Sequence, residues 1–476
     1  MNINDISSAY FIGIGGIGMS ALARFFHRKG VKVLGYDKTA TPLTDELQVE
    51  GMTIRFEEDI EAIPKDVDVV VYTPAIPENH TELQYYQNSA IPVLKRSEVL
   101  ALVTKDTFTI AIAGSHGKTS VTSMIAHILE QAGYGCTAFV GGIMVNYNSN
   151  YLSGRTDVIV VEADEYDRSF LRLHPNVAVI TAVDTDHLDI YGTEAGVQEA
   201  FRLFAGQLKE NGLLVAKEGI SILPDLEVNG RITTYHLQSE TADFHNRQIS
   251  ILGGAYIFEL QTPLNRYAQL ALNIGGLHNV ENAIAAIAVA ENLGIEGQAI
   301  AEALATFKGI KRRFEYIIQP KPKRAAIALS ESEDNDIEEI EVKRNRVVMI
   351  DDYAHHPEEL RALLSSVRDL YPNKKITAIF QPHLYSRTKD LAEGFGKSLD
   401  LADEVILLNI YPAREKPMEG VTSQLILDQM TIEEKSICPK SELLEKMEGR
   451  DFEVLLTVGA GDISDLVKPI KTLCLS

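Results

Sequence analysis

Short apolar runs alternate with longer segments of helical periodicity along most of the chain. In residues 1–106 the runs are AYFIGIG, VKVLGYD and DVVVYTP, and in residues 107–313 they are TIAIAG, DVIVVEAD and NVAVITAVD. In residues 314–476 they are RVVMIDD, KITAIFQPH, EVILLNIYPARE and EVLLTVGAGD. Strands that alternate with helices predict parallel α/β architecture, here in three domains with these bounds.

Two segments depart from this alternation. A polar, more β-like portion lies between Leu213 and Leu272, and an apolar helix is predicted from Asn279 to Asn292, with Gly294 as its stop. The acidic stretch around 331–341 lacks a period and is interpreted as an exposed insertion. The four runs of the last block end in polar or glycine residues, and ligands of open parallel sheets bind beyond such strand ends.

Composition narrows the class of protein. The chain has 476 residues and a formal net charge of −22, which argues against a nucleic-acid binder. Cys136, Cys438 and Cys474 are scattered, which indicates a reducing compartment without a disulfide framework. No signal peptide and no apolar run of the ~20 residues needed to span a bilayer is visible. We therefore expect a cytoplasmic protein with no membrane partner.

The stretch TIAIAGSHGKTS carries the strongest chemical signal. An apolar run ends at Gly114, loops through Ser115, His116 and Gly117, and enters a helix at Lys118-Thr119-Ser120. Backbone N–H groups of such a loop face phosphate, the lysine neutralises charge and a hydroxyl can hold Mg²⁺. Ile112 stands where the usual nucleotide pattern has a glycine, so the loop is shorter than usual. The stretch predicts a nucleoside triphosphate site.

A second glycine motif, GIGGIG, follows the first run and opens a helix. It comprises Gly13, Ile14, Gly15, Gly16, Ile17 and Gly18, with Met19 and Ser20 next and Asp37 at the end of the following run. This geometry suits any ligand with a diphosphate, including NAD and a UDP-sugar. A purely structural glycine turn is the alternative.

Acidic residues follow two runs of the middle block. Glu162 is the first acidic residue at the end of its apolar run, so it is favoured as a Mg²⁺ ligand. The alternative for this group of acids is that one of them caps the next helix. His187, within Asp184 to Asp189, could hold a metal or be a buried, hydrogen-bonded histidine. The residues alone favour the structural histidine.

Amides and arginines mark the end of the middle block. Asn279 and Asn282 share one helix face, where they could cap the helix or contact a nucleotide. The side chains of Arg312 and Arg313 diverge, so one could reach a developing phosphoryl charge while the other pairs elsewhere. A solvated linker explains the arginines equally well.

The last block adds polar residues at two strand ends. Asp351 and Asp352 precede His355, and Pro357 suits the first turn of the helix that follows. The aspartates could hold ribose hydroxyls, metal-bound water or an amine. His383 and Arg387 follow the next run and could bind a carboxylate.

Taken in order, the motifs GIGGIGMS, AGSHGKTS, EADE, DTDHLD, GLHNVENA, RRFE, DDYAHHP, FQPH and GAGD resemble those of the Mur ligases of peptidoglycan synthesis. The resemblance covers nearly the whole chain. It implies an N-terminal Rossmann-like domain for a UDP-sugar, a central P-loop ATPase-like parallel sheet for ATP, and a C-terminal Rossmann-like domain that completes the nucleotide and amino-acid site.

The resemblance is greatest to the branch that joins L-alanine to the lactyl carboxylate of UDP-N-acetylmuramate. It implies transfer of the γ-phosphoryl group of ATP to that carboxylate, followed by attack of the amine on the acyl phosphate. Domain closure is expected, since the reacting atoms must approach within ~3.5 Å. The implied partners are these small molecules, and the implied assembly is a monomer or homodimer.

The resemblance also implies a role for each residue that matches a family motif. Lys118 would hold the β- and γ-phosphates, Thr119 and Glu162 one Mg²⁺, and His187 a second. Asn279 and Asn282 would lie along the nucleotide, Arg313 would face the transferring phosphoryl group, and Asp351 or Asp352 would contact nucleotide or amine. By the same resemblance, Gly13 to Ser20 would bind the diphosphate of the UDP-sugar, with Asp37 beside it. His355, His383 and Arg387 would lie on the substrate side.

Some positions depart from the family pattern. Ser115 and Ser120 stand where threonine is usual, and Leu384 stands where relatives often have arginine. No lysine occurs between Asp184 and Phe204, consistent with the alanine-adding branch, which lacks the carbamylated lysine of other members. A ligase that couples a whole tripeptide to the same sugar nucleotide, and an NAD-dependent oxidoreductase built on the first block, are the alternatives.

Overall fold

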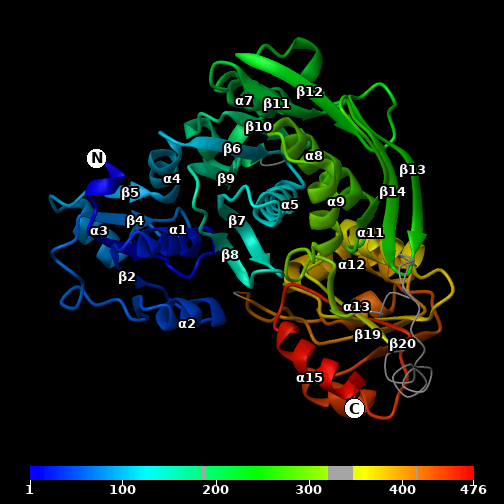
Figure 1. The fold of residues 1–476 in the computed structure, drawn as a ribbon. Helices are drawn as coiled ribbons and strands as arrows, with labels where there is room; N and C mark the ends of the chain where they lie inside the picture. Colours follow the sequence, from blue (N-terminus) through cyan, green and yellow to red (C-terminus); the bar gives the residue numbers. More distant parts are fainter. Residues whose placement is uncertain (185–187, 320–346, 414, 476) are drawn as a thin grey trace, which may run out of the picture. The chain divides into compact units, whose positions relative to one another are not determined.

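The computed structural model describes residues 1–184, 188–319, 347–413 and 415–475. They divide into two compact units. The first unit comprises residues 1–248, 259–269 and 281–305, and the second comprises 249–258, 270–280 and the described residues from 306 onward. Three β-sheets of five, ten and six strands succeed one another along the chain (Figure 1).

The five-stranded sheet lies in the first unit and has the order β3-β2-β1-β4-β5. Every neighbouring pair is parallel, and this order is that of a Rossmann-type sheet. Continuous apolar runs suit strands that are covered on both faces, as in β1 and β4. The elements are β1 (Ser8–Ile12), α1 (Ile17–Arg28), β2 (Lys32–Tyr36), α2 (Pro42–Val49), β3 (Thr53–Arg55), β4 (Val69–Tyr72), α3 (Thr81–Gln87), β5 (Val93–Lys95) and α4 (Arg96–Thr104).

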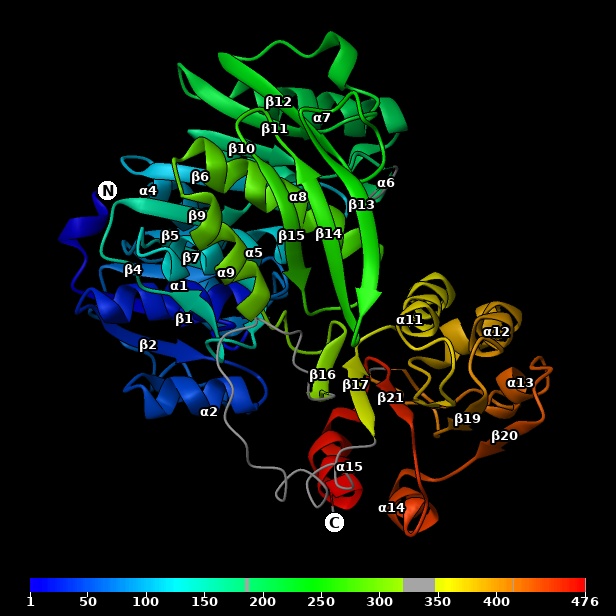
Figure 2. The same cartoon turned by 45° about the vertical axis from the view of Figure 1, so that its right-hand side comes forward.

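The ten-stranded sheet has the order β15-β14-β13-β12-β11-β10-β6-β9-β7-β8, and Figure 2 shows its long strands β13 to β15. Neighbouring strands are parallel from β13 through β12, β11, β10, β6 and β9 to β7, whereas β8 is antiparallel to β7. The elements are β6 (Phe108–Ala113), α5 (Lys118–Gln131), β7 (Thr137–Met144), β8 (Ser149–Leu152), β9 (Val158–Glu162), the 3-10 helix η2 (Tyr166–Arg172), β10 (Val177–Ile180), α6 (Leu188–Tyr191), α7 (Glu194–Gly206), β11 (Gly212–Lys217), β12 (Gly230–His236), β13 (Phe244–Leu252), β14 (Ala255–Gln261), β15 (Arg266–Leu272), α8 (Leu277–Asn292) and α9 (Gly297–Thr306).

Helix α5 packs on the parallel centre of this sheet, where it contacts β6, β7 and β9. Two left-handed glycines bound it. Gly117 (φ 82°) precedes its first residue and Gly133 (φ 73°) follows its last turn. The helix start is therefore held at the end of β6, which is the position that a phosphate loop requires.

Asn150 of β8 joins the hairpin β7–β8 to the start of α1. Its buried amide nitrogen donates to the hydroxyl of Ser20 (2.9 Å) and to the carbonyl of Ile17, and its amide oxygen accepts from Arg24 at 2.5 Å. Arg24 also pairs with Glu50 at 2.8 Å. This polar cluster connects the five-stranded sheet to the ten-stranded sheet within the first unit.

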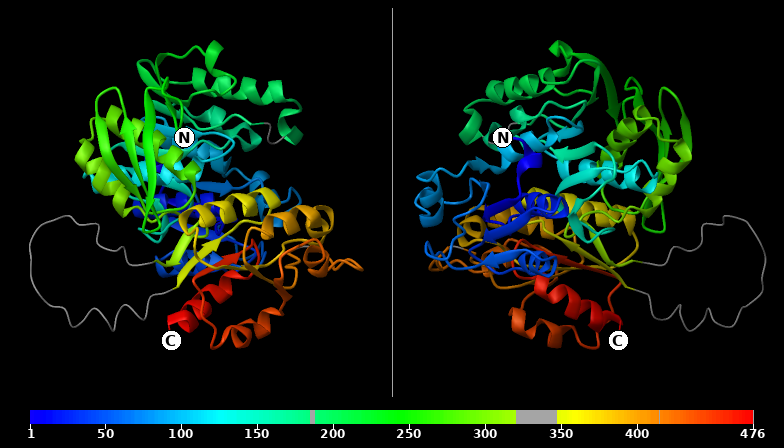
Figure 3. Two further views of the ribbon diagram at one scale, coloured as in Figure 1. Left: turned by 90° about the vertical axis from the view of Figure 1, so that its right-hand side faces the viewer. Right: turned by 60° about the vertical axis from the view of Figure 1, so that its left-hand side comes forward.

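The six-stranded sheet lies in the second unit and has the order β16-β17-β21-β18-β19-β20. All pairs are parallel except β16 with β17. Helix α15 contacts β16 and β17, and Figure 3 shows it in red at the end of the chain. The elements are β16 (Glu315–Ile318), β17 (Val348–Asp352), α11 (Pro357–Leu370), β18 (Ile376–Phe380), α12 (Tyr385–Leu399), β19 (Glu404–Leu407), α13 (Gln424–Leu427), β20 (Glu434–Ile437), α14 (Leu443–Met447), β21 (Val454–Val458) and α15 (Ser464–Leu475).

The predicted strand runs all form strands, and Pro357 opens α11 as expected. Helix α8 begins at Leu277, two residues before the predicted start. The antiparallel strands β8 and β16 were not predicted, since each is a short run without a clear period. The acidic insertion around 331–341 lies outside the described residues. Among the described residues, no helix is both long and apolar enough to cross a membrane.

Candidate active site

The first glycine loop connects β1 to α1. Gly13 has φ 84° and its N–H donates to the carbonyl of Tyr36, and the last glycine of the motif, Gly18, lies in the first turn of α1. Asp37 accepts from the backbone N–H of Gly15 at 2.8 Å and from that of Thr39 at 3.2 Å. The carboxylate at the end of β2 therefore holds the glycine loop in place.

The second glycine loop runs from Gly114 to Gly117 and packs tightly against the end of β10. Gly114 has φ 141°, and a Cβ there would lie 2.0 Å from Oγ1 of Thr181 and 2.9 Å from the backbone N of Ala182. Thr181 Oγ1 also donates to the carbonyl of His116. Only glycine satisfies both the backbone angle and the space at this position.

The polar side chains of the loop are held by the β10 segment as well. The hydroxyl of Ser115 accepts from the N–H of Asp184 at 2.8 Å. His116 is exposed, with Nε2 3.7 Å from a carboxylate oxygen of Asp184. The loop thus has a fixed backbone at the N-terminus of α5, where unpaired N–H groups and the helix dipole favour an anion.

Lys118, the first residue of α5, turns back over the loop. Its Nζ donates to the carbonyl of Gly114 at 2.6 Å and lies 2.8 Å from Glu165, whose side chain is 4 % exposed. The ammonium group is therefore beside the loop, where a phosphate would compete with Glu165 for it.

Thr119 and Glu162 place two oxygen ligands side by side. Thr119 is buried, and its hydroxyl donates to Glu162 Oε2 at 3.2 Å, while Glu162 Oε1 accepts from the backbone N–H of Gly141. A hydroxyl and a carboxylate next to a phosphate loop fit Mg²⁺, which is usually bound by few protein ligands together with phosphate. Among the described residues, no three His, Cys, Asp or Glu side chains form a metal cluster.

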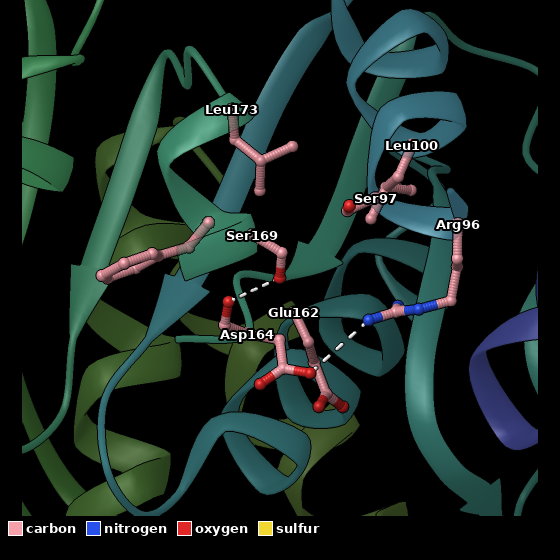
Figure 4. Close-up of a pocket in the computed structure, with 8 residues that line it drawn as sticks. Arg96, Ser97, Leu100, Glu162, Asp164, Ser169 and Leu173 are labelled. Carbon is pink, nitrogen blue, oxygen red and sulfur yellow. Dashed lines mark hydrogen bonds and ion pairs between the residues drawn. The ribbon is translucent and has the colours of Figure 1, made fainter. Parts of the chain in front are cut away.

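A pocket opens beside Glu162, between α4 and the segment that follows β9 (Figure 4). Arg96 extends into it from the start of α4, with Nη2 3.5 Å from Oδ2 of Asp164. The lining residues are Arg96, Ser97, Leu100, Glu162, Asp164, Ser169, Phe170 and Leu173.

The two asparagines at the start of α8 have different surroundings. Asn282 faces the phosphate loop, since a Cβ on Gly117 would lie 2.7 Å from its amide oxygen. Asn279 is buried, and its side chain donates to the carbonyl of Gly275 at 2.7 Å.

In the second unit, Arg312 is the arginine held by carboxylate and backbone groups. It has φ 60°, its Nε lies 3.2 Å from Asp351, its Nη2 donates to the carbonyl of Gly459, and its guanidinium lies 4.9 Å from the ring centre of Tyr353. Arg313 is exposed. Arg312 is therefore the arginine that pairs elsewhere, and the role of Arg313 stays a prediction.

The aspartates that end β17 are both desolvated. Burial raises the pKa of Asp351, although hydrogen bonds from Thr457 and Arg312 oppose the shift. Burial raises the pKa of Asp352 to about 6, although backbone N–H groups of Phe314 (2.7 Å) and Ala354 (2.8 Å) donate to its two oxygens. Asp352 therefore ties the segment after β17 to the Arg312–Phe314 turn.

His355, His383 and Arg387 lie together at the strand ends of this sheet. The two imidazole ring centres are 6.0 Å apart, His383 stacks on Tyr411 at 5.9 Å, and Arg387 donates to the carbonyl of His355 at 3.4 Å. This grouping fits a site beyond the carboxyl ends of parallel strands. Leu384, next to His383, has φ 70° and stands just before α12.

Known protein families match all three blocks of the chain. The match is to the Mur ligase family catalytic domain over residues 8–107, the Mur ligase middle domain over 112–290, and the Mur ligase glutamate ligase domain over 337–461. The UDP-N-acetylmuramate–L-alanine ligase of Flavobacterium johnsoniae is 46 % identical over 99 % of both chains. That of Parabacteroides distasonis is 44 % identical over 99 % of this chain and 98 % of its own.

This chain belongs to the Mur ligase family.

Solved structures agree with this assignment. The UDP-N-acetylmuramate–alanine ligase of Thermotoga maritima has a TM-score of 0.79 at 30 % identity and covers 97 % of each chain. A murein peptide ligase of Psychrobacter arcticus has a TM-score of 0.64 at 22 % identity, over 98 % of each chain, and shares the fold. The predicted three-domain α/β fold is confirmed, whereas the exact bounds at residues 106 and 313 stay predictions.

Several residues of the Mur ligase site were not predicted from sequence. Thr181 shapes the loop, Glu165 holds Lys118, Gly141 binds Glu162, and Arg96 enters the pocket. Each acts through a neighbour distant in sequence, so motif spacing gives no signal for it. Glu165 belongs to the EADE motif, in which the sequence predicted a metal role for Glu162 and helix capping for a neighbouring acid. His187 lies outside the described residues, so its predicted metal role has no structural test here.

The close packing of the phosphate loop yields a stability prediction. Gly114→Ala should lower the free energy of unfolding by more than ~2 kcal/mol, because the new methyl group adds a collision to an unfavourable φ. Gly133→Ala is the matched control, since Gly133 also has a positive φ but has nothing within 4 Å of its Cβ position. Its cost should stay near ~1 kcal/mol. Urea unfolding of both variants measures this, and equal losses would contradict the packing argument.

The half-buried, desolvated carboxyl group of Asp352 predicts a pH effect on stability. Its folded pKa of about 6 lies above the unfolded value of ~3.9, so its contribution is fully present below pH ~4 and is lost as pH rises through 6. Relative to Asp352→Asn, the wild type should lose roughly 2–3 kcal/mol between pH 4 and pH 7.5. Parallel urea titrations measure the difference, with the exposed Asp451→Asn as baseline. A pH-independent difference would show that the carboxyl group is not desolvated.

Proposed function

We propose that this Mur ligase is an ATP-dependent ligase that joins L-alanine to the lactyl carboxylate of UDP-N-acetylmuramate, in peptidoglycan synthesis. The observation that carries the proposal is the full-length identity of 41–46 % to relatives that are named UDP-N-acetylmuramate–L-alanine ligase. The phosphate loop, absent from a simple dinucleotide-binding oxidoreductase, supports ligation over the NAD alternative.

The chemistry requires activation of a carboxylate. A carboxylate oxygen is a poor leaving group, so the γ-phosphoryl group of ATP is transferred to it and an acyl phosphate forms. The amine of L-alanine then attacks the acyl carbon, and the tetrahedral intermediate expels phosphate as the amide forms. Such transfers depend on positioning and on neutralisation of charge.

The first unit supplies the groups for ATP. In this proposal, Gly114 to Ser120 enclose the phosphates at the N-terminus of α5, and Lys118 leaves Glu165 to neutralise the β- and γ-phosphates. Asn282, beside Gly117, contacts the nucleotide. Thr119 and Glu162 hold a Mg²⁺ ion, which when bound shields charge on the phosphates. His187 is proposed for a second ion on the family pattern alone.

The other proposed roles follow the sequence motifs. Gly13 to Ser20 bind the diphosphate of the UDP-sugar at the start of α1, and Asp37 keeps the loop in shape. In the second unit, Arg313 faces the transferring phosphoryl group, while Arg312 fixes the backbone through Asp351. Asp351 or Asp352 contacts the nucleotide or the amine, and Asn279 lies along the nucleotide. His355, His383 and Arg387 bind the substrate carboxylate. A cytoplasmic location and a monomeric or dimeric assembly belong to the same proposal.

The decisive experiment measures phosphate release by the full chain with ATP, Mg²⁺, UDP-N-acetylmuramate and a panel of amines. We expect turnover with L-alanine far above that with the tripeptide L-alanyl-D-glutamyl-diaminopimelate. The reverse preference would assign the chain to tripeptide recycling. Release that is independent of every amine would contradict ligation, and a tight 1:1 complex with NADH would favour the oxidoreductase.

Lys118→Met should lower kcat for ligation at least ~10³-fold, because the phosphates lose the cation that neutralises them. Binding of UDP-N-acetylmuramate should be nearly unchanged, since a different loop holds it. The substitution also removes the cation 2.8 Å from the buried Glu165, so the double variant Lys118→Met with Glu165→Gln separates stability from catalysis. We expect the double variant to recover thermal stability and no activity. Restored activity, or loss of sugar-nucleotide binding in both variants, would refute the assignment.

A further inference from the structure

Arg96 lies against the first glycine loop. It is the first residue of α4, and its side chain passes over Gly18, where a Cβ would lie 2.9 Å from Nη1, 3.1 Å from Cδ and 3.3 Å from Cζ. The last glycine of the GIGGIG motif therefore makes room for this side chain. The guanidinium group consequently borders the N-terminus of α1, where the diphosphate is proposed to bind.

The far end of the guanidinium group reaches the pocket beside Glu162. Nη2 is 3.5 Å from Oδ2 of Asp164, and Figure 4 shows the group pointing toward both carboxylates. The side chains of Arg96 and Asp164 are 25 % and 42 % exposed, and an ion pair of this length and exposure contributes little stability. Asp164 itself is held by the backbone, since its Oδ1 accepts from the N–H of Tyr166 at 3.1 Å.

The pocket needs a cation to accept an anion. Glu162 and Asp164 are both acidic, the chain carries a net charge of −22, and Arg96 is the arginine among the pocket-lining residues. A planar guanidinium group matches the oxygens of phosphate and carboxylate with two parallel hydrogen bonds. Leu100, Phe170 and Leu173 add apolar surface next to it, which lowers the competition from water.

We propose that Arg96 is a substrate-binding residue that exchanges its contact with Asp164 for an anionic oxygen of the UDP-sugar. That oxygen belongs to the diphosphate or to the lactyl carboxylate, both of which have the required charge. Asp164 acts as a positioning residue, because it orients the guanidinium group before the substrate arrives and competes with the substrate for it. The inference rests on the proposed function, since it requires a UDP-sugar at the first loop.

Calorimetric titration of the full chain with UDP-N-acetylmuramate, without ATP or added metal, tests this role. Arg96→Ala should raise Kd at least tenfold, and Arg96→Lys should give an intermediate value because it keeps the charge without the planar fork. Asp164→Asn should lower Kd two- to fivefold, because it removes the competing charge and can still accept from Tyr166. If the Arg96–Asp164 pair only joined α4 to the segment that follows β9, Asp164→Asn would weaken binding as well.

Arg172→Ala is the matched control. Arg172 of η2 lies 3.6 Å from Glu98 of α4, and so joins α4 to the same region of the chain, outside the pocket lining. Its Kd for the sugar nucleotide should equal that of the wild type, with thermal melts confirming that every variant folds. Wild-type binding by Arg96→Ala, or an equal loss in Arg172→Ala, would overturn the inference.

A second titration with UDP-N-acetylglucosamine, which lacks the lactyl carboxylate, identifies the oxygen. An equal loss of affinity for both sugars in Arg96→Ala assigns the contact to the diphosphate, and a loss confined to UDP-N-acetylmuramate assigns it to the carboxylate. If the wild type binds neither sugar nucleotide, the proposed function itself fails, which is distinct from a failure confined to Arg96.

Discussion

The approach of the Gly114 backbone to Thr181 is the constraint on which the proposed ATP site depends. At this point the end of β6 comes so close to the end of β10 that no side chain fits between them. The contact fixes the loop, the loop fixes the first residue of α5, and α5 in turn fixes Lys118 and Thr119. Because the backbone is set by packing in the sheet, the phosphate-facing N–H groups need little rearrangement when an anion binds.

A second theme is the pairing of cations with acids in this acidic chain. Lys118 lies beside Glu165, Arg312 lies beside Asp351, and the half-buried guanidinium group of Arg96 lies beside Asp164. Buried or half-buried charges without partners are costly, so each cation has a carboxylate to orient it. Where an anionic substrate is proposed to bind one of these cations, it displaces the carboxylate. The affinity for the substrate then reflects the difference in free energy between the cation–substrate contact and the cation–carboxylate contact.

The sequence predicted the fold class well because strand runs in buried parallel sheets are continuous and apolar, as in β6 and β17. It predicted the two glycine loops because a left-handed backbone requires glycine, and Gly13, Gly114 and Gly117 all have positive φ. It did not predict Thr181, Glu165 or Arg96, whose partners are far away in the chain. Such contacts arise from the way the strands are ordered in the sheet, which local periodicity does not encode.

The buried amide of Asn150 has a consequence for inhibitor chemistry. Asn150 of β8 donates hydrogen bonds to the first turn of α1, and so connects the first glycine loop to the sheet that carries the second glycine loop. Both loops belong to one compact unit, and Asn150 is a direct contact between the elements that carry them. A single molecule with a stiff spacer of matching length would meet both loops without ordering either of them, and would gain affinity through that rigidity.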